Sequence, residues 1–475
     1  MFPNLIWCAA LVALLVALTF GVRAIGRPVL TVAVVHNAIW AGALALIGTN
    51  LIDYKTSSTL AWATLATGLV AFNAGAAIIS MLLARGRPIR ARGWLRTRPT
   101  YLTTRPLFFV ALGLYAAAFL TYLVSLQLRF GLATILEHPS IIRRAGQHGG
   151  VSYLESMPLP ARLLLYLGPV LFAILAYGPA LDRPFKLPTR IVGLVVVAGT
   201  MAALLQRSNL FIAILLVCAL YISRPYTERQ VAPENTRRGH LAALWARAPR
   251  PVRLVASVAL LGIVALAAFQ GVGGALGKSG QQAIWSGAVS QPLERTGLTA
   301  PFQYYTAGTV AFLQMVDATE VQPRKDYDPE PQTWGASTFG LVLKAVPGVP
   351  HVDPISPFID TGVMTNVYTW LAPYYQDLRL GGVLIGSLLY AMLAGWLFIR
   401  RNESQTMFWI QAALLATVFL APFATRLNSA LVVTMIVYVA ALSLATRWLA
   451  SRALNRGVLA ADLAPEHQEA GRSER

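Results

Sequence analysis

The sequence predicts an all-α polytopic membrane protein. Of its 475 residues, 56% are hydrophobic and only 12% are charged, whereas soluble globular domains carry about 25% charged residues. Apolar runs of about 20 residues, long enough to span a bilayer as a helix, recur along the chain. No polar stretch has both the length and the patterning of a soluble domain. We therefore expect one integral membrane domain over residues 1–475.

Eleven apolar runs are expected to be transmembrane helices. The first has no basic residues before it, so we expect a retained helix rather than a cleaved signal peptide. Cys8 and Cys218 lie inside apolar runs, a pattern that indicates neither a disulfide nor a metal cluster. The expected spans are 3–22, 28–49, 59–84, 106–127, 160–181, 189–206, 208–223, 254–272, 380–399, 407–423 and 429–446.

The net charge of +19 belongs almost entirely to alternate loops. The basic loops and the C-terminal tail hold 26 Lys and Arg and 8 Asp and Glu, a net charge of +18. The other loops hold 13 and 12, a net charge of +1. The positive-inside rule places the first set in the cytoplasm. The N-terminus is then outside, and the polar tail 457–475 is cytoplasmic. We interpret the arginines as topology signals and contacts to anionic membrane lipids, and expect no nucleic-acid partner.

The largest expected outer segment is the loop 273–378, between the eighth and ninth spans. Its patterned stretch 298–316, which contains Tyr304 and Tyr305, is expected to form an amphipathic or re-entrant helix. An irregular polar run beginning at His351 follows. Because non-helical backbone near a bilayer needs water or protein cover, we expect this loop to fold over an outward-facing cavity.

Polar and aromatic side chains crowd the end of this loop, where an apolar helix begins. Aromatic rings, an amide, a carboxylate and a guanidinium are typical of a site for sugars and phosphate, although interfacial anchoring also explains the aromatic rings. The residues are Asn366, Tyr368, Trp370, Tyr374, Tyr375, Asp377 and Arg379.

Arginines at two tight breaks between apolar runs are expected at the same outer level. Arg207 lies in Gln-Arg-Ser-Asn and Arg426 in Thr-Arg-Leu-Asn. A guanidinium matches phosphate oxygens and stays charged in a low dielectric, so both suit a lipid diphosphate. Arg143 and Arg144, beside a glycine-rich turn, form a further candidate phosphate contact. The alternatives are helix ends anchored by snorkelling and an ordinary surface pair.

A general base is the other group that a glycosyl transfer to a hydroxyl needs. Asp377 and His351 are the preferred candidates, with an N-cap as the alternative role for Asp377. No His, Cys and Asp cluster has metal-ligand spacing, and no phosphate-binding loop for a nucleotide is present. We therefore expect neither a metal nor a cofactor.

Three segments together resemble the O-antigen polymerase family (Wzy-like oligosaccharide repeat-unit polymerases). They are the helical hairpin around Arg207, the long outer loop with Tyr304 and Tyr305, and the closing pattern Asn366-Val-Tyr-Thr…Tyr375-x-Asp377-x-x-x-Gly381. Arg379 and Leu380 depart from this pattern, which has small or aromatic residues after the aspartate.

The resemblance implies a GT-C-like fold and an inverting, metal-independent glycosyltransferase of the bacterial cytoplasmic membrane. Its substrates would be oligosaccharides on undecaprenyl or another polyprenyl diphosphate, polymerised on the outer face, with a flippase and a chain-length regulator as partners. Arg207 and Arg426 would hold the diphosphate, helped by the Arg143 pair. Asp377 or His351 would orient or deprotonate the acceptor hydroxyl. The aromatic residues of the closing segment would stack on sugars or frame the lipid access.

Two alternatives stay open at this point. One is an oligosaccharide ligase of the same broad type. The other is a flippase or transporter of lipid-linked oligosaccharides, which usually has two similar halves and charged residues deep within its helices. This sequence shows neither feature, so it favours a transferase.

Overall fold

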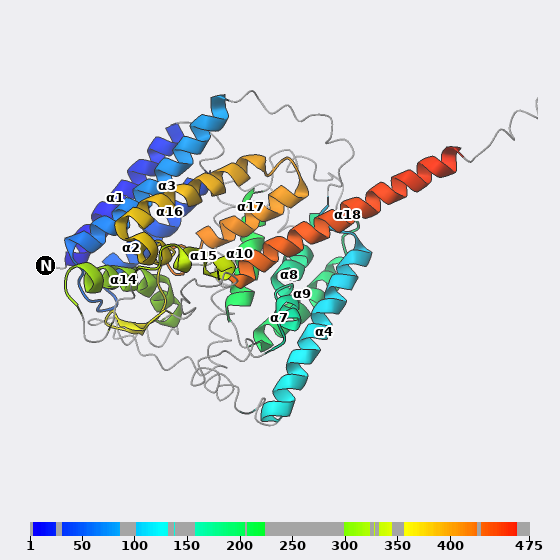
Figure 1. Ribbon diagram of the computed structural model, residues 1–475, viewed down its shortest axis with the longest axis horizontal. Helices are drawn as coiled ribbons and strands as arrows, with labels where there is room; N and C mark the ends of the chain where they lie inside the picture. Colours follow the sequence, from blue (N-terminus) through cyan, green and yellow to red (C-terminus); the bar gives the residue numbers. More distant parts are fainter. Residues whose placement is uncertain are drawn as a thin grey trace, which may run out of the picture.

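The chain folds into a bundle of long helices (Figure 1). The computed structural model describes residues 3–24, 31–85, 101–131, 137, 157–204, 207–223, 299–323, 327, 332–343, 356–424 and 429–462. Within them, the sheet structure is one hairpin of β1 (Ile359–Asp360) and β2 (Met364–Thr365). Seven described helices are long and apolar enough to cross a membrane. The protein is therefore an all-α membrane protein, as its composition predicts.

Ten of the eleven expected spans coincide with helices. They are α1 (Pro3–Ala24), α2 (Thr31–Gly48), α3 (Thr59–Arg85), α4 (Arg105–Phe130), α7 (Leu159–Leu165) with α8 (Gly168–Ala176), α9 (Leu187–Ala203), α10 (Arg207–Ser223), α16 (Ala372–Arg400), α17 (Gln405–Val418) and α18 (Ala430–Asp462). Three of them, α9, α10 and α17, have 17, 17 and 14 residues. The expected span 254–272 lies outside the described residues, so eleven spans remain a prediction.

Four helix boundaries differ from the sequence prediction. α16 begins at Ala372, inside the expected loop, whereas the expected span begins at residue 380. The expected span 160–181 is interrupted between α7 and α8, where Pro169 in the first turn of α8 lacks the N–H that would continue a helix from α7. The 3-10 helix η4 (Gly178–Ala180) then takes up the end of that span. α17 ends at Val418, before the turn that contains Pro422. α18 continues to Asp462, into the segment expected to be a polar tail.

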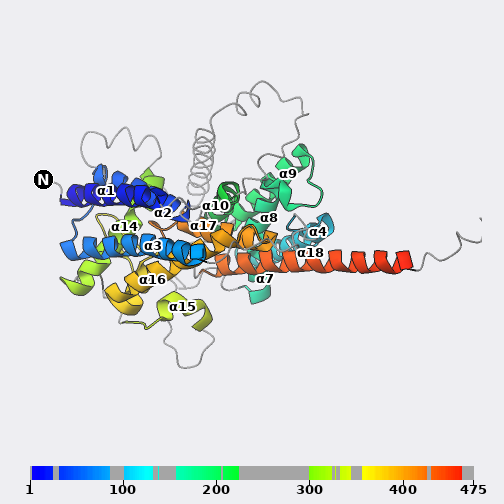
Figure 2. The ribbon, with the colours of Figure 1, turned by 90° about the horizontal axis from the view of Figure 1, so that it is seen from above.

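The helices form two groups joined near the middle of the bundle (Figure 1). α1, α2, α3 and α16 pack together in one group, and α4 and α7 to α10 form the other. α17 packs against both α16 and α10, so it joins the two groups. The second half of α18 extends beyond the other helices (Figures 1 and 2).

The closest helix pairing is between α3 and α16. Gly68 lies against Leu371 and Val383, and Gly75 lies against Leu388 and Ala391. Positions increase together along the two helices, so they run in the same direction. Glycine lets helix backbones in a membrane approach closely, which strengthens van der Waals packing. This pairing fixes the start of α16 beside the start of α3.

Described residues beside several of the expected basic loops meet at one end of the bundle, which we call the basic end. Thr446 Oγ1 donates to the Leu102 carbonyl (3.1 Å), Arg401 Nε to the Ser223 carbonyl (3.2 Å) and Arg105 Nε to the Arg183 carbonyl (2.6 Å). Most of the two arginine-rich loops, 85–105 and 224–253, lies outside the described residues, so the cytoplasmic assignment of this end remains a prediction.

The opposite end, which we call the site end, carries the loop 49–58, α14 (Thr299–Glu320), the hairpin and the turn 419–424. Thr309 donates to the Pro422 carbonyl at 3.3 Å, and the Trp370 N–H donates to the Ala421 carbonyl at 3.0 Å. α14 is the helix expected over 298–316. It is covered by α2, α3 and the turn 419–424, and most of its residues from Thr306 onward are buried.

Replacing Gly75 by Ala is expected to separate α3 from α16. A Cβ at this position would lie 2.4 Å from the Leu388 carbonyl oxygen. This oxygen belongs to the backbone, so it cannot move aside as the end of a flexible side chain can. Overpacking of this kind costs about 1–3 kcal/mol, so the thermal unfolding midpoint in detergent should fall. Gly113→Ala in α4 is the control, because no atom lies within 4 Å of its Cβ. Equal midpoints for the two variants would contradict the packing described.

Candidate functional site

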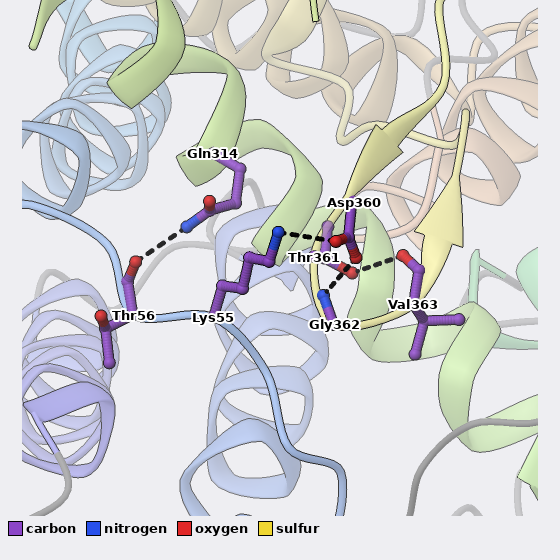
Figure 3. Close-up of polar contacts among 7 residues, drawn as sticks. All are labelled: Lys55, Thr56, Gln314, Asp360, Thr361, Gly362 and Val363. Carbon is purple, nitrogen blue, oxygen red and sulfur yellow. Dashed lines mark hydrogen bonds and ion pairs between the residues drawn. The ribbon is translucent and has the colours of Figure 1, made fainter. Parts of the chain in front are cut away.

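The site end is built on α14, which is fastened to the loop 49–58 along its length. The Tyr54 hydroxyl pairs with Thr306 Oγ1 at 2.5 Å, and Gln314 Nε2 donates to the Thr56 carbonyl at 2.9 Å (Figure 3). Near the end of α14, Asp317 accepts from the Ser58 N–H at 3.0 Å. Burial raises the pKa of Tyr54, so its hydroxyl stays protonated and its role is structural.

The hairpin β1–β2 is held against the same loop by Lys55 (Figure 3). Lys55 Nζ lies 2.6 Å from Asp360 Oδ2, and the Lys55 N–H donates to the Thr361 carbonyl at 2.9 Å. The Gly362 N–H donates to Asp360 Oδ1 at 2.9 Å. Gly362 has a φ of +98°, and a Cβ there would lie 2.2 Å from the Asp53 carbonyl oxygen. Only glycine allows this turn and this approach.

A hollow lies between the first turns of α14 and the hairpin. It is small, with a volume of about 30 Å³, and is partly open to solvent. Its lining consists of Gln303, Ala307, Phe358, Met364, Thr365, Asn366 and Val367. Segments some 60 residues apart in sequence therefore meet in one concave surface, and the predicted site residue Asn366 is part of it.

Two amides supply the hydrogen-bonding capacity of the hollow. Gln303 is only 6% exposed, and Asn366 is partly exposed. Neither side-chain amide makes a hydrogen bond to another described residue. Each amide offers two donors and an acceptor. With the exposed ring of Phe358 and the thioether of Met364 beside them, they match a ligand with both hydroxyl groups and apolar faces, such as a sugar.

The predicted aromatic residues lie beneath this surface and not on it. Trp370 is 4% exposed and packs among His36, Phe72 and Tyr390, with the Tyr390 ring centroid at 4.8 Å. Tyr374 meets the Trp370 ring edge-on at 5.8 Å. This arrangement favours packing roles for Trp370 and Tyr374 over stacking on sugars.

Two further predicted tyrosines also use their hydroxyl groups within the protein. Tyr368 is buried and donates to the Pro357 carbonyl at 2.8 Å, which ties the segment before α16 to the start of the hairpin. Tyr305 donates to the Ile39 carbonyl at 2.6 Å, which ties α14 to α2. Both tyrosines support the hollow from behind, since they fix the elements that line it.

α16 is broken near its start, at Leu378 and Arg379. Arg379 has φ +54° and ψ −138°, a backbone conformation that residues other than glycine rarely adopt. The start of the helix therefore folds back on its main part. The Tyr374 carbonyl lies against Gly382, and the Tyr374 ring lies against Gly386. Of the two glycines at the end of the predicted pattern, Gly382 is in close contact with Tyr374. No atom lies within 4 Å of a Cβ at Gly381.

Asp377, the preferred catalytic carboxylate, is 3% exposed and fully engaged. It accepts from Thr333 Oγ1 at 2.5 Å, from the Ser337 N–H at 3.0 Å and from the Thr338 N–H at 2.9 Å. These amides belong to the first turn of α15 (Ala336–Leu343). Asp377 thus stabilises the N-terminus of a neighbouring helix, and this geometry favours a structural role over that of a base.

A second carboxylate at the break is more accessible. Tyr375 donates to Glu320 Oε1 at 2.9 Å, and Arg379 Nε lies 3.7 Å from the same oxygen. The guanidinium also lies over the Tyr375 ring at 5.4 Å. Glu320 and Arg379 are both partly exposed, so this cluster links the end of α14 to the break in contact with solvent.

For several predicted site residues, the structure does not describe the side chain or the whole residue. α10 begins at Arg207, whose side chain is not described, and the same holds for the side chain of Tyr304 in α14. Arg426, Arg143, Arg144 and His351 lie outside the described residues. Beside Arg207, Asn209 is buried, and neither polar atom of its amide has a hydrogen-bond partner among the described residues. A buried amide without partners is costly and uncommon.

Sequence reasoning missed Gln303 and Lys55, and it counted Asp360 and Glu320 among the outer carboxylates without preferring them. Gln303 directly precedes the tyrosine pair that the sequence indicates, but a single glutamine carries no signal of its own. Lys55 and Asp360 are 305 positions apart, so their pairing follows only from the fold. In the part of the chain that the structure describes, no three His, Cys, Asp or Glu side chains converge as metal ligands would.

Comparison with known proteins gives no relative: no family model, no curated protein and no solved structure matches this chain.

Replacing Gly362 by Ala is expected to detach the hairpin from the loop 49–58, because the added Cβ would collide with the Asp53 carbonyl. Amide hydrogen exchange over 359–365 should become faster by at least tenfold. Gly131→Ala provides the matched control, since Gly131 also has positive φ (+78°) but no atom within 4 Å of its Cβ. Unchanged exchange over 359–365 would show that the hairpin is not held as described.

Two substitutions of Arg379 should separate backbone strain from side-chain contacts. Both Arg379→Ala and Arg379→Gly lose the contacts to Glu320 and Tyr375, but only glycine relieves the positive φ. We expect the glycine variant to be more stable than the alanine variant by about 1 kcal/mol in chemical denaturation. An alanine variant as stable as the glycine variant would mean that the break carries no strain.

Proposed function

We propose that this protein is a membrane glycosyltransferase that polymerises oligosaccharide units carried on polyprenyl diphosphate. In this proposal it has a GT-C-like fold with eleven spans and works in a bacterial cytoplasmic membrane, with the site end outside and the basic end in the cytoplasm. The growing glycan leaves its lipid diphosphate and is transferred to a hydroxyl of the next unit. The diphosphate leaving group supplies the driving force.

The observation that carries the proposal is the hollow lined by two amides that make no hydrogen bond to another described residue. Gln303 and Asn366 come from different segments and converge on one concave surface at an end of a membrane bundle. Amide donors and acceptors beside Phe358 and Met364 suit a sugar with polar edges and apolar faces.

Charge placement supports the orientation and the leaving-group site. Described residues beside several expected basic loops, among them Arg105, Arg183 and Arg401, lie at the basic end, which the positive-inside rule would assign to the cytoplasm. The hollow lies at the opposite end, where flipped lipid-linked sugars would be displayed. In our proposal Arg207 and Arg426 stabilise the charge that develops on the departing diphosphate, and the buried amide of Asn209 lies beside Arg207.

The structure also bears on the choice of acceptor base. Asp377 has three hydrogen bonds within the protein, and His351 lies outside the described residues. Two described carboxylates near the closing segment are partly exposed, Glu320 and Asp360. Glu320 lies at the far end of α14 from Gln303, and Asp360 is engaged by Lys55 and by the Gly362 N–H. Our proposal therefore keeps His351 as the base and assigns Asp377 a positioning role.

The test is a polymerisation assay with purified protein, a lipid-linked repeat unit and neither nucleotide nor metal. A ladder of products is expected. Gln303→Ala and Asn366→Ala should each lower the initial rate at least tenfold, and Arg207→Ala should abolish the ladder. Gln127→Ala and Arg129→Ala, at the exposed end of α4, are the matched controls and should leave the rate unchanged.

Two results would contradict the proposal. One is that no ladder forms and the substrate instead moves into the lumen of vesicles, where it is protected from added reagents. That result would indicate a transporter. The other is a single addition of glycan to a different lipid acceptor without a ladder, which would indicate a ligase.

A further inference from the structure

A short helix on the flank of the bundle exposes two large aromatic side chains. α15 lies beside α16, outside the main helix packing (Figure 2). Trp334, just before it, is 75% exposed, and Phe339 within it is 61% exposed. Apolar side chains of this size are costly in water, so their exposure at one place calls for a partner.

The segment that carries these rings is held rigidly. Asp377 accepts hydrogen bonds from the Ser337 and Thr338 N–H groups in the first turn of α15 and from Thr333 Oγ1 just before it. The Thr333 N–H donates to the Gln376 carbonyl at 3.3 Å. Trp334 has a φ of +49° and Gly335 a φ of +98°. A tryptophan at positive φ is strained, and such strain persists only where the surroundings impose it. The exposure of the two rings is therefore a fixed feature of the fold.

The surface next to α15 indicates what covers the rings. The main part of α16 begins after the break, and its outward face exposes Leu380, Leu384 and Ile385. α16 is one of the membrane-crossing helices, so this apolar face is in contact with lipid. Leu378, at the break, is also exposed and connects this face to the residues that hold α15. The two aromatic side chains thus continue a lipid-facing surface at its outer edge.

We propose that α15 is an interfacial helix whose Trp334 and Phe339 are inserted in the bilayer leaflet at the site end. Tryptophan and phenylalanine are favoured at the boundary between headgroups and acyl chains, where an amphipathic helix lies in the membrane plane. Asp377 is then the positioning residue that fixes the depth and direction of this helix relative to α16. This proposal does not depend on the reaction that the protein catalyses.

The depth of the rings can be measured with spin labels. Cys8 and Cys218 are free and buried, and both are replaced by Ala to give a cysteine-free protein. A nitroxide at Trp334→Cys or Phe339→Cys is compared with labels at Leu384→Cys, on the lipid face, and Thr56→Cys, in the exposed loop. The protein is reconstituted in phosphatidylcholine vesicles, and collisions with oxygen and with a water-soluble nickel chelate are measured by power saturation.

Labels at 334 and 339 are expected to collide with oxygen at least threefold more than with the nickel chelate, as the Leu384 label does. Nickel accessibility equal to that of the Thr56 label would overturn the proposal. So would protection of the two labels from nickel by added soluble oligosaccharide in detergent, because that result would assign the rings to sugar stacking.

Asp377→Ala separates anchoring from simple exposure. It should release α15, so the spectrum of the label at 339 should lose its immobilised component, while the Leu384 label is unchanged. Asp317→Ala, which removes a carboxylate bound to the loop 49–58 and not to α15, is the control and should leave the 339 label immobilised. An immobilised label in the Asp377 variant would overturn the positioning role.

Discussion

The close approach of α3 and α16 is the constraint on which the rest of the structure depends. Because Gly68 and Gly75 bring the two backbones together, the start of α16 is fixed at the same level as the loop 49–58. The position of the start of α16 in turn fixes the break at Arg379, the segment 366–371 and the hairpin. α14 then completes the site end. Its polar contacts are with residues 54–58, so it must lie at the same level as the loop 49–58.

Much of the fold could be predicted because membrane helices follow from local composition. Apolar length placed ten of the eleven expected spans on described helices, to within a few residues at most boundaries. The sorting of the loops by charge remains a prediction, because most of the basic loops lie outside the described residues. The break in α16 was not predicted, because Leu378 and Arg379 are not helix-breaking residues. Their conformation comes from the fit of Tyr374 against Gly382 and Gly386, a tertiary effect with no local signal.

The site was predictable only in part, and for a related reason. Asn366 was found because it stands in a motif, and it does line the hollow. The aromatic residues of the same motif have the right chemistry for sugars, but the fold buries Trp370 and Tyr368. Asp377 was weighed as a base or a cap. The sequence could not identify α15 as the helix that it caps, because Asp377 and Ser337 are 40 positions apart.

The pairing of α3 with α16 also sets the order in which the protein is assembled. Gly75 and Ala391 are in contact but are separated by 316 positions. At a synthesis rate of about 5–20 residues per second, α3 waits roughly 15–60 s in the bilayer before its partner emerges. During that interval its glycine face is open to lipid and to other helices. Because the site end needs α14, the hairpin and the turn 419–424, it is among the last parts of the molecule to be completed.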